Sequence, residues 1–227
     1  MQAKSIDPTI SCLEHRHYSL VAVAIALWTL SVATARARDA MPVVPAAKAL
    51  QLLLDGNQRY VGDHPERPNH RPSDSAQHPI AVVLSCSDSR VPPEIIFDQG
   101  VGNLFVVRVA GNTYDRLALQ SIQYAVGHLG TTLIMVIGHD QCGAVTAAVK
   151  AYPGTQSGPM LTNIYPAVSK ARTEAGDEVS NAINDNALLI ARRLQKEPEL
   201  AEKVESGQLE VLPARYILKT GAVKLLK

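Results

Sequence analysis

The strongest constraint on the fold is the alternation of short apolar runs with helical segments between residues 80 and 152. The runs "IAVVLS" (80–85), "LFVVRVA" (104–110) and "TLIMVIG" (132–138) have the length and the nearly unbroken aliphatic character of strands buried on both faces. Because strands that are joined through helices run parallel, this order predicts an α/β fold with a central, mainly parallel β-sheet flanked by helices.

The helices expected around this sheet are recognised by their spacing and their ends. Residues 92–100 begin with two prolines and end at a glycine, and residues 115–130 form an amphipathic helix that Gly130 closes. The remaining expected elements are helices at 141–152, 160–173, 178–196 and near Pro198, a strand at 208–212 and an edge strand after it.

The segment before the sheet is predicted to be a helical arm and a connector, together residues 38–79. Leucines at helical spacing predict a helix over 46–61, with Gly56-Asn57 as a stop or kink. Residues 62–79 contain four prolines and little apolar content, which predicts an extended connector. Residues 80–227 are expected to form one core without an internal domain boundary.

Composition excludes some classes of function. The chain has 227 residues, of which 46% are hydrophobic, and a formal net charge of +1. A chain of this size buries about 70% of its unfolded surface, so its core needs no covalent staples. The near-zero net charge provides no basic surface for nucleic acid.

The N-terminus is typical of a bacterial secretory signal peptide over residues 1–37. Residues 19–35 contain no charged side chain, and two small-x-small cleavage sites follow at their end. Cleavage would place the mature protein in the periplasm or outside the cell, free of the membrane and without Cys12. The alternative is an uncleaved signal anchor, because 17 apolar residues reach the lower limit for spanning a bilayer.

Three side chains suited to a metal follow the ends of two predicted strands. Cys86 follows the run at 80–85, whereas His139 and Cys142 follow the run at 132–138. Parallel strands place their carboxyl ends at the same edge of the sheet, where such folds bind ligands. Two thiolates and an imidazole suit zinc, and three protein ligands leave a fourth position open, as in catalytic zinc sites.

Asp88 and Arg90 stand at alternate positions after Cys86, so in an extended segment they point the same way. Arg90 can hold Asp88 in a bidentate pair, and Asp88 can either complete the zinc shell in a closed state or accept a hydrogen bond from bound water. Each residue alone also has an ordinary interpretation. Asp88 and Arg90 could form a loop salt bridge, His139 could be structural, and the two cysteines could form a disulfide in an oxidising compartment.

The combination resembles the β-class carbonic anhydrases. The similarity is carried by the segments 86–112, 121–130 and 138–145, and it extends from about Leu50 to the final "TGAVKLL". It implies Cys86, His139 and Cys142 as zinc ligands and Asp88-Arg90 as a gating dyad. It further implies a zinc lyase that converts CO2 and water reversibly to bicarbonate and a proton. A dimer with active sites at the subunit interface would be the minimal unit, and a tetramer is the larger assembly expected.

The resemblance also implies a substrate cleft. Gln77, Phe105 and Tyr124 match cleft residues of plant-like members: the Gln77 amide would donate to a substrate oxygen, and the two rings would form walls. Val83 and Ser85 depart from members that bicarbonate inhibits at a second site, which carry Trp and Gly there. The "AGN" at 110–112 and Gly127 are interpreted as ordinary variation.

Two rival functions are considered beside CO2 hydration. A CS2 or COS hydrolase would use the same fold and metal site and would differ only in its cleft. A non-catalytic exported protein would instead join Cys86 and Cys142 in a disulfide. The zinc content and the number of free thiols of the mature protein distinguish the metal enzyme from the disulfide-bonded protein.

Overall fold

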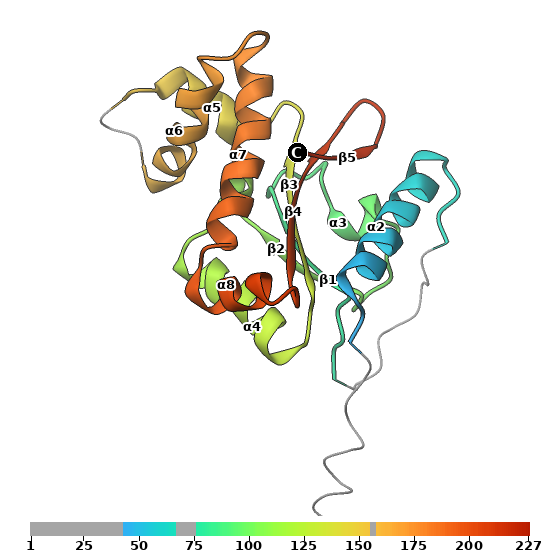
Figure 1. The fold of residues 1–227 in the computed structure, drawn as a ribbon. Helices are drawn as coiled ribbons and strands as arrows, with labels where there is room; N and C mark the ends of the chain where they lie inside the picture. Colours follow the sequence, from blue (N-terminus) through green and yellow to red (C-terminus); the bar gives the residue numbers. More distant parts are fainter. Residues whose placement is uncertain (1–42, 67–75, 155–157) are drawn as a thin grey trace, which may run out of the picture. The chain divides into compact units, whose positions relative to one another are not determined.

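The expected parallel sheet is present in the computed structural model, which describes residues 43–66, 76–154 and 158–227 (Figure 1). Within these residues the strands form one sheet in the order β2-β1-β3-β4-β5, with the first four parallel and β5 antiparallel to β4. The strands are β1 (Ala81–Ser85), β2 (Leu104–Arg108), β3 (Leu133–His139), β4 (Glu210–Tyr216) and β5 (Val223–Leu225). The predicted fold class and the expected edge strand are therefore confirmed, and the structure adds that this strand is antiparallel to its neighbour.

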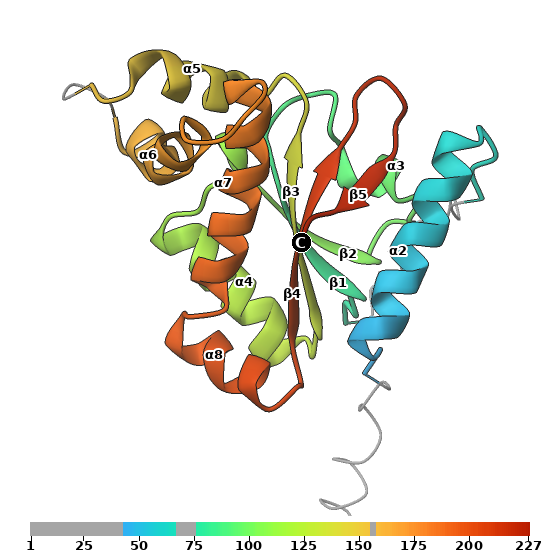
Figure 2. The same cartoon turned by 45° about the horizontal axis from the view of Figure 1, so that its top comes forward.

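Helices cover both faces of the sheet, and the period of two along β1 shows how the strand contributes to both layers (Figures 1 and 2). Val82 and Leu84 pack with α4 (Arg116–His128), α7 (Glu178–Leu194) and α8 (Pro198–Glu205). Ala81 and Val83 pack on the other side, against α2 (Ala46–Val61) and α3 (Pro93–Ile96). A strand buried on both faces needs an unbroken apolar run, which is why 80–85 carries no alternation.

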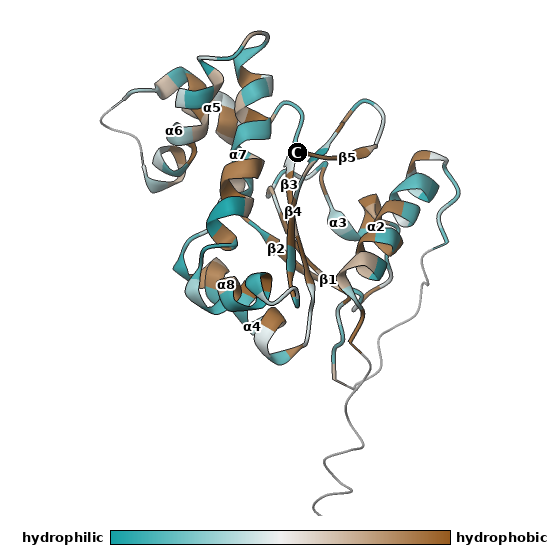
Figure 3. Ribbon diagram, viewed as in Figure 1, coloured by the Kyte–Doolittle hydropathy of each residue, from teal (hydrophilic) through white to brown (hydrophobic). Residues whose placement is uncertain are grey.

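The hydropathy of the ribbon follows this layering (Figure 3). The central strands are mostly hydrophobic, whereas the helices are hydrophobic on the side that faces the sheet and hydrophilic outside. Two further helices, α5 (Gly143–Ala151) and α6 (Pro159–Ala171), pack with α7 around a third apolar cluster that contains both Cys86 and Cys142. Because it contains Cys86 and Cys142, this cluster borders the sheet edge at which β1 and β3 end.

Of the stop or kink predicted at Gly56-Asn57, the stop is wrong, because α2 runs from Ala46 to Val61 without interruption. A Cβ atom at position 56 would lie 1.8 Å from the carbonyl oxygen of Phe97, so glycine is needed there for close packing. Asn57 is buried, and its side-chain amide donates hydrogen bonds to the carbonyl oxygens of Ile96 and Gly221. Both residues dock the helix on its neighbours rather than end it.

The helix expected at 92–100 is also shorter than predicted, since α3 ends at Ile96. Asp98 has a φ of 47°, in the left-handed region, which a continuing helix does not allow. The guanidinium of Arg59 donates to the Asp98 carboxylate at 2.7 Å and holds it in this turn. The helix α3 therefore ends before the glycine, at a turn that contacts α2 through Asp98 and Arg59.

The proposed signal peptide lies outside the described residues. Among those that the structure describes, there is no helix whose length and apolar character would suffice to cross a membrane. The described part from Val43 onward forms one compact unit.

Candidate metal centre

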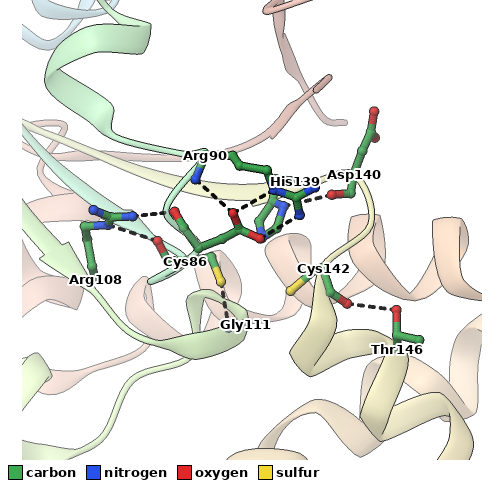
Figure 4. A network of polar contacts seen from close by, with 9 residues as sticks. Cys86, Arg90, Arg108, Gly111, His139, Asp140, Cys142 and Thr146 are labelled. Atoms are coloured by element: carbon green, nitrogen blue, oxygen red, sulfur yellow. Dashed lines mark hydrogen bonds and ion pairs between the residues drawn. The ribbon is translucent and has the colours of Figure 1, made fainter. Parts of the chain in front are cut away.

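The structure brings together the three side chains that were predicted to bind a metal. Ser85 of β1 pairs with Ile137 of β3, so Cys86 leaves its strand beside the end of β3, where His139 is the last residue. Cys142 is the residue that precedes the first turn of α5. All three are buried, and their ligand atoms lie within 4.8 Å of one another (Figure 4).

The orientation of the His139 ring is set by one hydrogen bond. Its Nδ1 lies 2.8 Å from the backbone carbonyl oxygen of Asp140, which can only accept a hydrogen bond (Figure 4). The hydrogen must therefore be on Nδ1, and Nε2 carries the free lone pair. Nε2 is buried and has no hydrogen-bond partner in the structure. A buried nitrogen in this condition is suited to a metal.

The environment of Cys86 favours the thiolate. The Cys142 thiol, which donates a hydrogen bond, lowers the pKa of Cys86 to about 3 together with the neighbouring His139 ring and the backbone N–H groups of Gly111 and Asp88, although burial of the thiol opposes this. Because Cys142 donates to Cys86 and is itself buried, the pKa of Cys142 is raised. One negative charge is therefore already stabilised at the group before any cation is bound.

These donor atoms fit zinc. Both cysteines are free thiols in the described structure, so the disulfide interpretation has no support there. Two sulfurs and a neutral imidazole nitrogen are soft and borderline donors of the kind that zinc takes, and a divalent cation would remove the second thiol proton as well. The site can therefore hold one metal ion through three protein ligands.

Asp88 and Arg90 form the bidentate pair that their spacing predicted. Arg90 donates from Nε to Oδ1 at 3.0 Å and from Nη2 to Oδ2 at 2.8 Å, and its backbone N–H also donates to Oδ1. These hydrogen bonds from Arg90 lower the pKa of Asp88 well below its usual range. The Oδ2 atom of Asp88 lies 3.9 Å from Nε2 of His139. Asp88 therefore stands beside the three-residue group, bound to Arg90 and ionised.

Arg108 contacts the candidate site and was not predicted from the sequence. Its guanidinium, on β2, donates to the backbone carbonyl oxygens of Cys86, at 3.1 Å, and of Asp88 (Figure 4). Both bonds fix the backbone of the segment that carries Cys86 and Asp88. The one sequence signal was a charged residue within an otherwise apolar strand.

The interpretation of "AGN" (110–112) as ordinary variation was wrong. Gly111 has a φ of 69°, and its N–H donates to the sulfur of Cys86 at 3.3 Å. A Cβ atom there would lie 2.9 Å from Cδ1 of Ile164. Asn186, which is fully buried, donates to the Gly111 carbonyl oxygen at 2.7 Å. Gly111 therefore combines a left-handed turn with a hydrogen bond to Cys86, one of the three clustered side chains Cys86, His139 and Cys142, which are called the metal group below.

The structure does not bring the three predicted cleft residues to the metal group within one chain. Phe105 pairs with Val82, four residues before Cys86, which places it roughly 13 Å down the strand. Tyr124, on α4, is 47% exposed, with its ring 6.5 Å from that of Phe105. Gln77 is exposed and precedes the amino end of β1, whereas the metal group lies at the carboxyl end.

Comparison with known proteins gives a consistent result. The family model described as carbonic anhydrase matches residues 81–223. The chain is 37% identical over 200 residues to carbonic anhydrase 2 of Mycobacterium tuberculosis, covering 82% of this chain and 95% of that protein. It is 36% identical over 199 residues to the carbonic anhydrase of Mycolicibacterium smegmatis, with the same two coverages.

Solved structures of β-carbonic anhydrases share the fold. The β-carbonic anhydrase CcaA superposes with a TM-score of 0.60 at 28% identity, covering 67% of this chain and 75% of that one. A structure of two tetrameric β-carbonic anhydrases from Sordaria macrospora gives a TM-score of 0.58 at 26% identity, covering 66% and 82%. The Coccomyxa β-carbonic anhydrase, with a TM-score of 0.61 at 24% identity and coverages of 79% and 82%, adds support for the fold alone.

Proposed function

Because the chain belongs to the β class of the carbonic anhydrase family, we propose that it hydrates CO2 reversibly to bicarbonate and a proton with one zinc ion held by Cys86, His139 and Cys142. The observation that supports this proposal most directly is the convergence of these three buried ligands beside an ionised Asp88. Zinc supplies a hydroxide nucleophile at a pH where free water would remain protonated. The residues of the chain would hold this ion and orient the attacking water.

Asp88 is proposed to orient the attacking water. Because both of its oxygens are bound by Arg90, the carboxylate stays ionised and can only accept hydrogen bonds. A water that donates to Asp88 turns a lone pair toward the carbon of CO2. Arg90 in turn holds the carboxylate in one orientation, and Arg108 holds the backbone that carries it.

Self-association is proposed to complete the substrate cleft. β2 is an edge strand of the sheet, and Phe105 on it contacts the exposed Tyr124. A second copy that docks on this edge could bring its own aromatic pair and Gln77 to the metal group of the first. A dimer or a larger assembly such as a tetramer is the consequence, and the relatives from Sordaria macrospora are tetrameric by description.

Export is a separate proposal. It is supported by the uncharged run at 19–35 and the two small-x-small sites that follow it. Expression of the full chain in a bacterium, followed by N-terminal sequencing of the periplasmic protein, would test it. A mature N-terminus close to residue 38 is expected. Retention of Met1 on membrane-bound protein would instead indicate a signal anchor.

The function is tested on the purified protein by three measurements made together: bound zinc, free thiols after denaturation with a chelator, and CO2 hydration by stopped flow. About one zinc per chain is expected, with both Cys86 and Cys142 titrating as thiols and hydration abolished by metal removal. Hydrolysis of CS2 and COS is assayed in parallel. Absence of zinc and of free thiols, or turnover of CS2 or COS without CO2 hydration, would overturn the proposal.

A further inference from the structure

The loop between His139 and Cys142 is short and strained. It consists of Asp140 and Gln141, and Gln141 has a φ of 53°, in the left-handed region. A non-glycine residue in this conformation costs about 1 kcal/mol or more and persists where the surroundings hold it in place. The loop also supplies the carbonyl oxygen of Asp140, which sets the His139 ring. Something must therefore keep the Asp140 peptide in its present orientation.

Arg215 is the residue that is placed to do so. It lies on β4 beside Gly138, and its Nε and Nη2 atoms lie 2.8 Å and 2.6 Å from Oδ1 of Asp140. Its remaining nitrogen, Nη1, donates to Oγ of Ser180 at 2.8 Å and to Oδ1 of Asn184 at 3.1 Å. The guanidinium therefore ties the loop to both β4 and α7. The backbone N–H of Asp140 also donates to the carbonyl oxygen of Tyr216, at 3.2 Å.

We propose that Arg215 is a positioning residue for the metal ligand His139 and acts through Asp140. The clamp on the Asp140 side chain holds the Asp140 peptide, the peptide carbonyl holds Nδ1–H of His139, and Nε2 is thereby directed at Cys86 and Cys142. Without the clamp the strained loop can relax, and the imidazole loses its fixed tautomer and direction. This inference rests on the proposed metal site but concerns a residue outside the group that binds the metal.

A purely architectural role for Arg215 predicts a different outcome, because it would lower global stability and leave metal affinity unchanged once the protein is folded. Arg172 offers a matched control. It also bonds a carboxylate, that of Glu178, at 2.7 Å, and reaches toward the carbonyl oxygens of Val149 and Tyr152. Like Arg215 it joins a helix to its neighbours, but it has no contact with the His139–Cys142 loop.

The test measures the zinc dissociation constant of the full chain by competition with a chromophoric chelator. The variants are Arg215→Met, Arg215→Lys, Asp140→Ala, the Arg215→Met/Asp140→Ala double variant and Arg172→Met. Circular dichroism and thermal unfolding of the metal-free proteins establish that each is folded. The visible spectrum of the Co2+-substituted proteins reports the ligand geometry independently of activity.

Arg215→Met and Asp140→Ala should each weaken zinc binding by about 10- to 100-fold, the usual effect of removing an outer partner of a ligating histidine. The double variant should bind no more weakly than Asp140→Ala, and Arg215→Lys should lie between wild type and Arg215→Met. Both single variants should alter the Co2+ spectrum, whereas Arg172→Met should match wild type.

Zinc affinity within about twofold of wild type in Arg215→Met, or additive losses in the double variant, would overturn the positioning role. If Arg215→Met does not fold, Asp140→Ala decides, and wild-type affinity in that variant would also overturn it. Failure of wild-type protein and Arg172→Met to bind zinc would be a failure of the proposed function instead.

Discussion

Two regions of this molecule favour opposite protonation states of their acidic side chains. At the carboxyl edge of the sheet the pKa values of Cys86 and Asp88 are lowered, so both side chains favour a negative charge. Beside α4, the hydroxyl of Tyr114 donates to the Glu197 carboxylate at 2.7 Å, and burial together with this contact raises the pKa of Tyr114. The sheet edge therefore favours a bound cation, whereas the Tyr114 side chain keeps its proton and stays neutral.

The pKa values of Cys86, Asp88 and Tyr114 shift in different directions because their polar neighbours differ. Burial alone does not explain this, since all three side chains are removed from water to some extent. Donors converge on the sheet edge: the N–H of Gly111 faces the Cys86 sulfur, and the guanidinium of Arg90 faces Asp88. Tyr114 packs against an apolar cluster and meets a carboxylate. Burial thus raises the pKa of an acid unless fixed donors oppose it. The charge of Cys86 and Asp88 therefore depends on the hydrogen-bond donors around them as much as on their burial.

The largest effect is expected from Cys142→Ser. Loss of one soft ligand leaves two protein donors, so bound zinc should fall from about one per chain to nearly none, and CO2 hydration should fall to the buffer rate. Metal analysis and stopped-flow hydration check this. Tyr114→Phe is the matched control from the other region and should keep both. Full zinc in Cys142→Ser would contradict the ligand assignment.

Arg90→Ala comes next and separates metal binding from turnover. Zinc should remain, because Arg90 contacts no ligand atom, whereas kcat should fall by about 10- to 100-fold as Asp88 loses its orientation. Arg90→Lys should rescue little of this, because a point charge cannot bond both carboxylate oxygens. The measurement is the steady-state rate of CO2 hydration, compared between wild type and the two variants at equal zinc content. Unchanged kcat in Arg90→Ala would show that the pair is only structural.

The third prediction compares two glycines. Gly111→Ala should destabilise the protein by about 1–3 kcal/mol, because the position has a positive φ and the new methyl group meets Ile164. Gly127→Ala, at an exposed helical position where a Cβ meets nothing, should leave stability unchanged or raise it by about 0.5–1 kcal/mol. Urea unfolding measures both. Equal effects would show that Gly111 is not required by its surroundings.

The smallest effect concerns pH. At pH 7, Tyr114→Phe should cost about 1 kcal/mol of unfolding free energy, since Glu197 loses a donor. The pKa of Tyr114 is higher in the folded state, so its contribution is complete below about pH 10, the unfolded value, and declines as the pH rises above it. The difference in unfolding free energy between wild type and Tyr114→Phe should therefore stay constant up to about pH 10 and narrow as the pH rises to about 11. A constant gap would mean that Tyr114 titrates alike in both states.

The cluster of Cys86, His139 and Cys142 could be predicted from the sequence, whereas the residues that support it could not. The functional candidates all lie at or just after the end of a recognisable strand, and parallel strands end at a common edge. They are Cys86, Asp88, Arg90, His139 and Cys142. Arg108 and Arg215 belong to other strands, and their partners are backbone or side-chain groups distant in sequence. No local pattern marks such a contact, because it depends on how two elements pack.

The sequence by itself determined the α/β class, the strands, most of the helices and the cluster of Cys86, His139 and Cys142, because hydrophobic periodicity and strand ends are local properties of the chain. Only the tertiary structure decided that Gly56 allows close packing inside a continuous helix, that Gly111 bonds the Cys86 sulfur and that Phe105 lies well away from the metal group in its own chain. The physical reason is shared by all three. Each depends on how far apart two segments that are distant in the sequence lie in the folded chain. Packing sets that distance, and the local pattern of residues does not encode it.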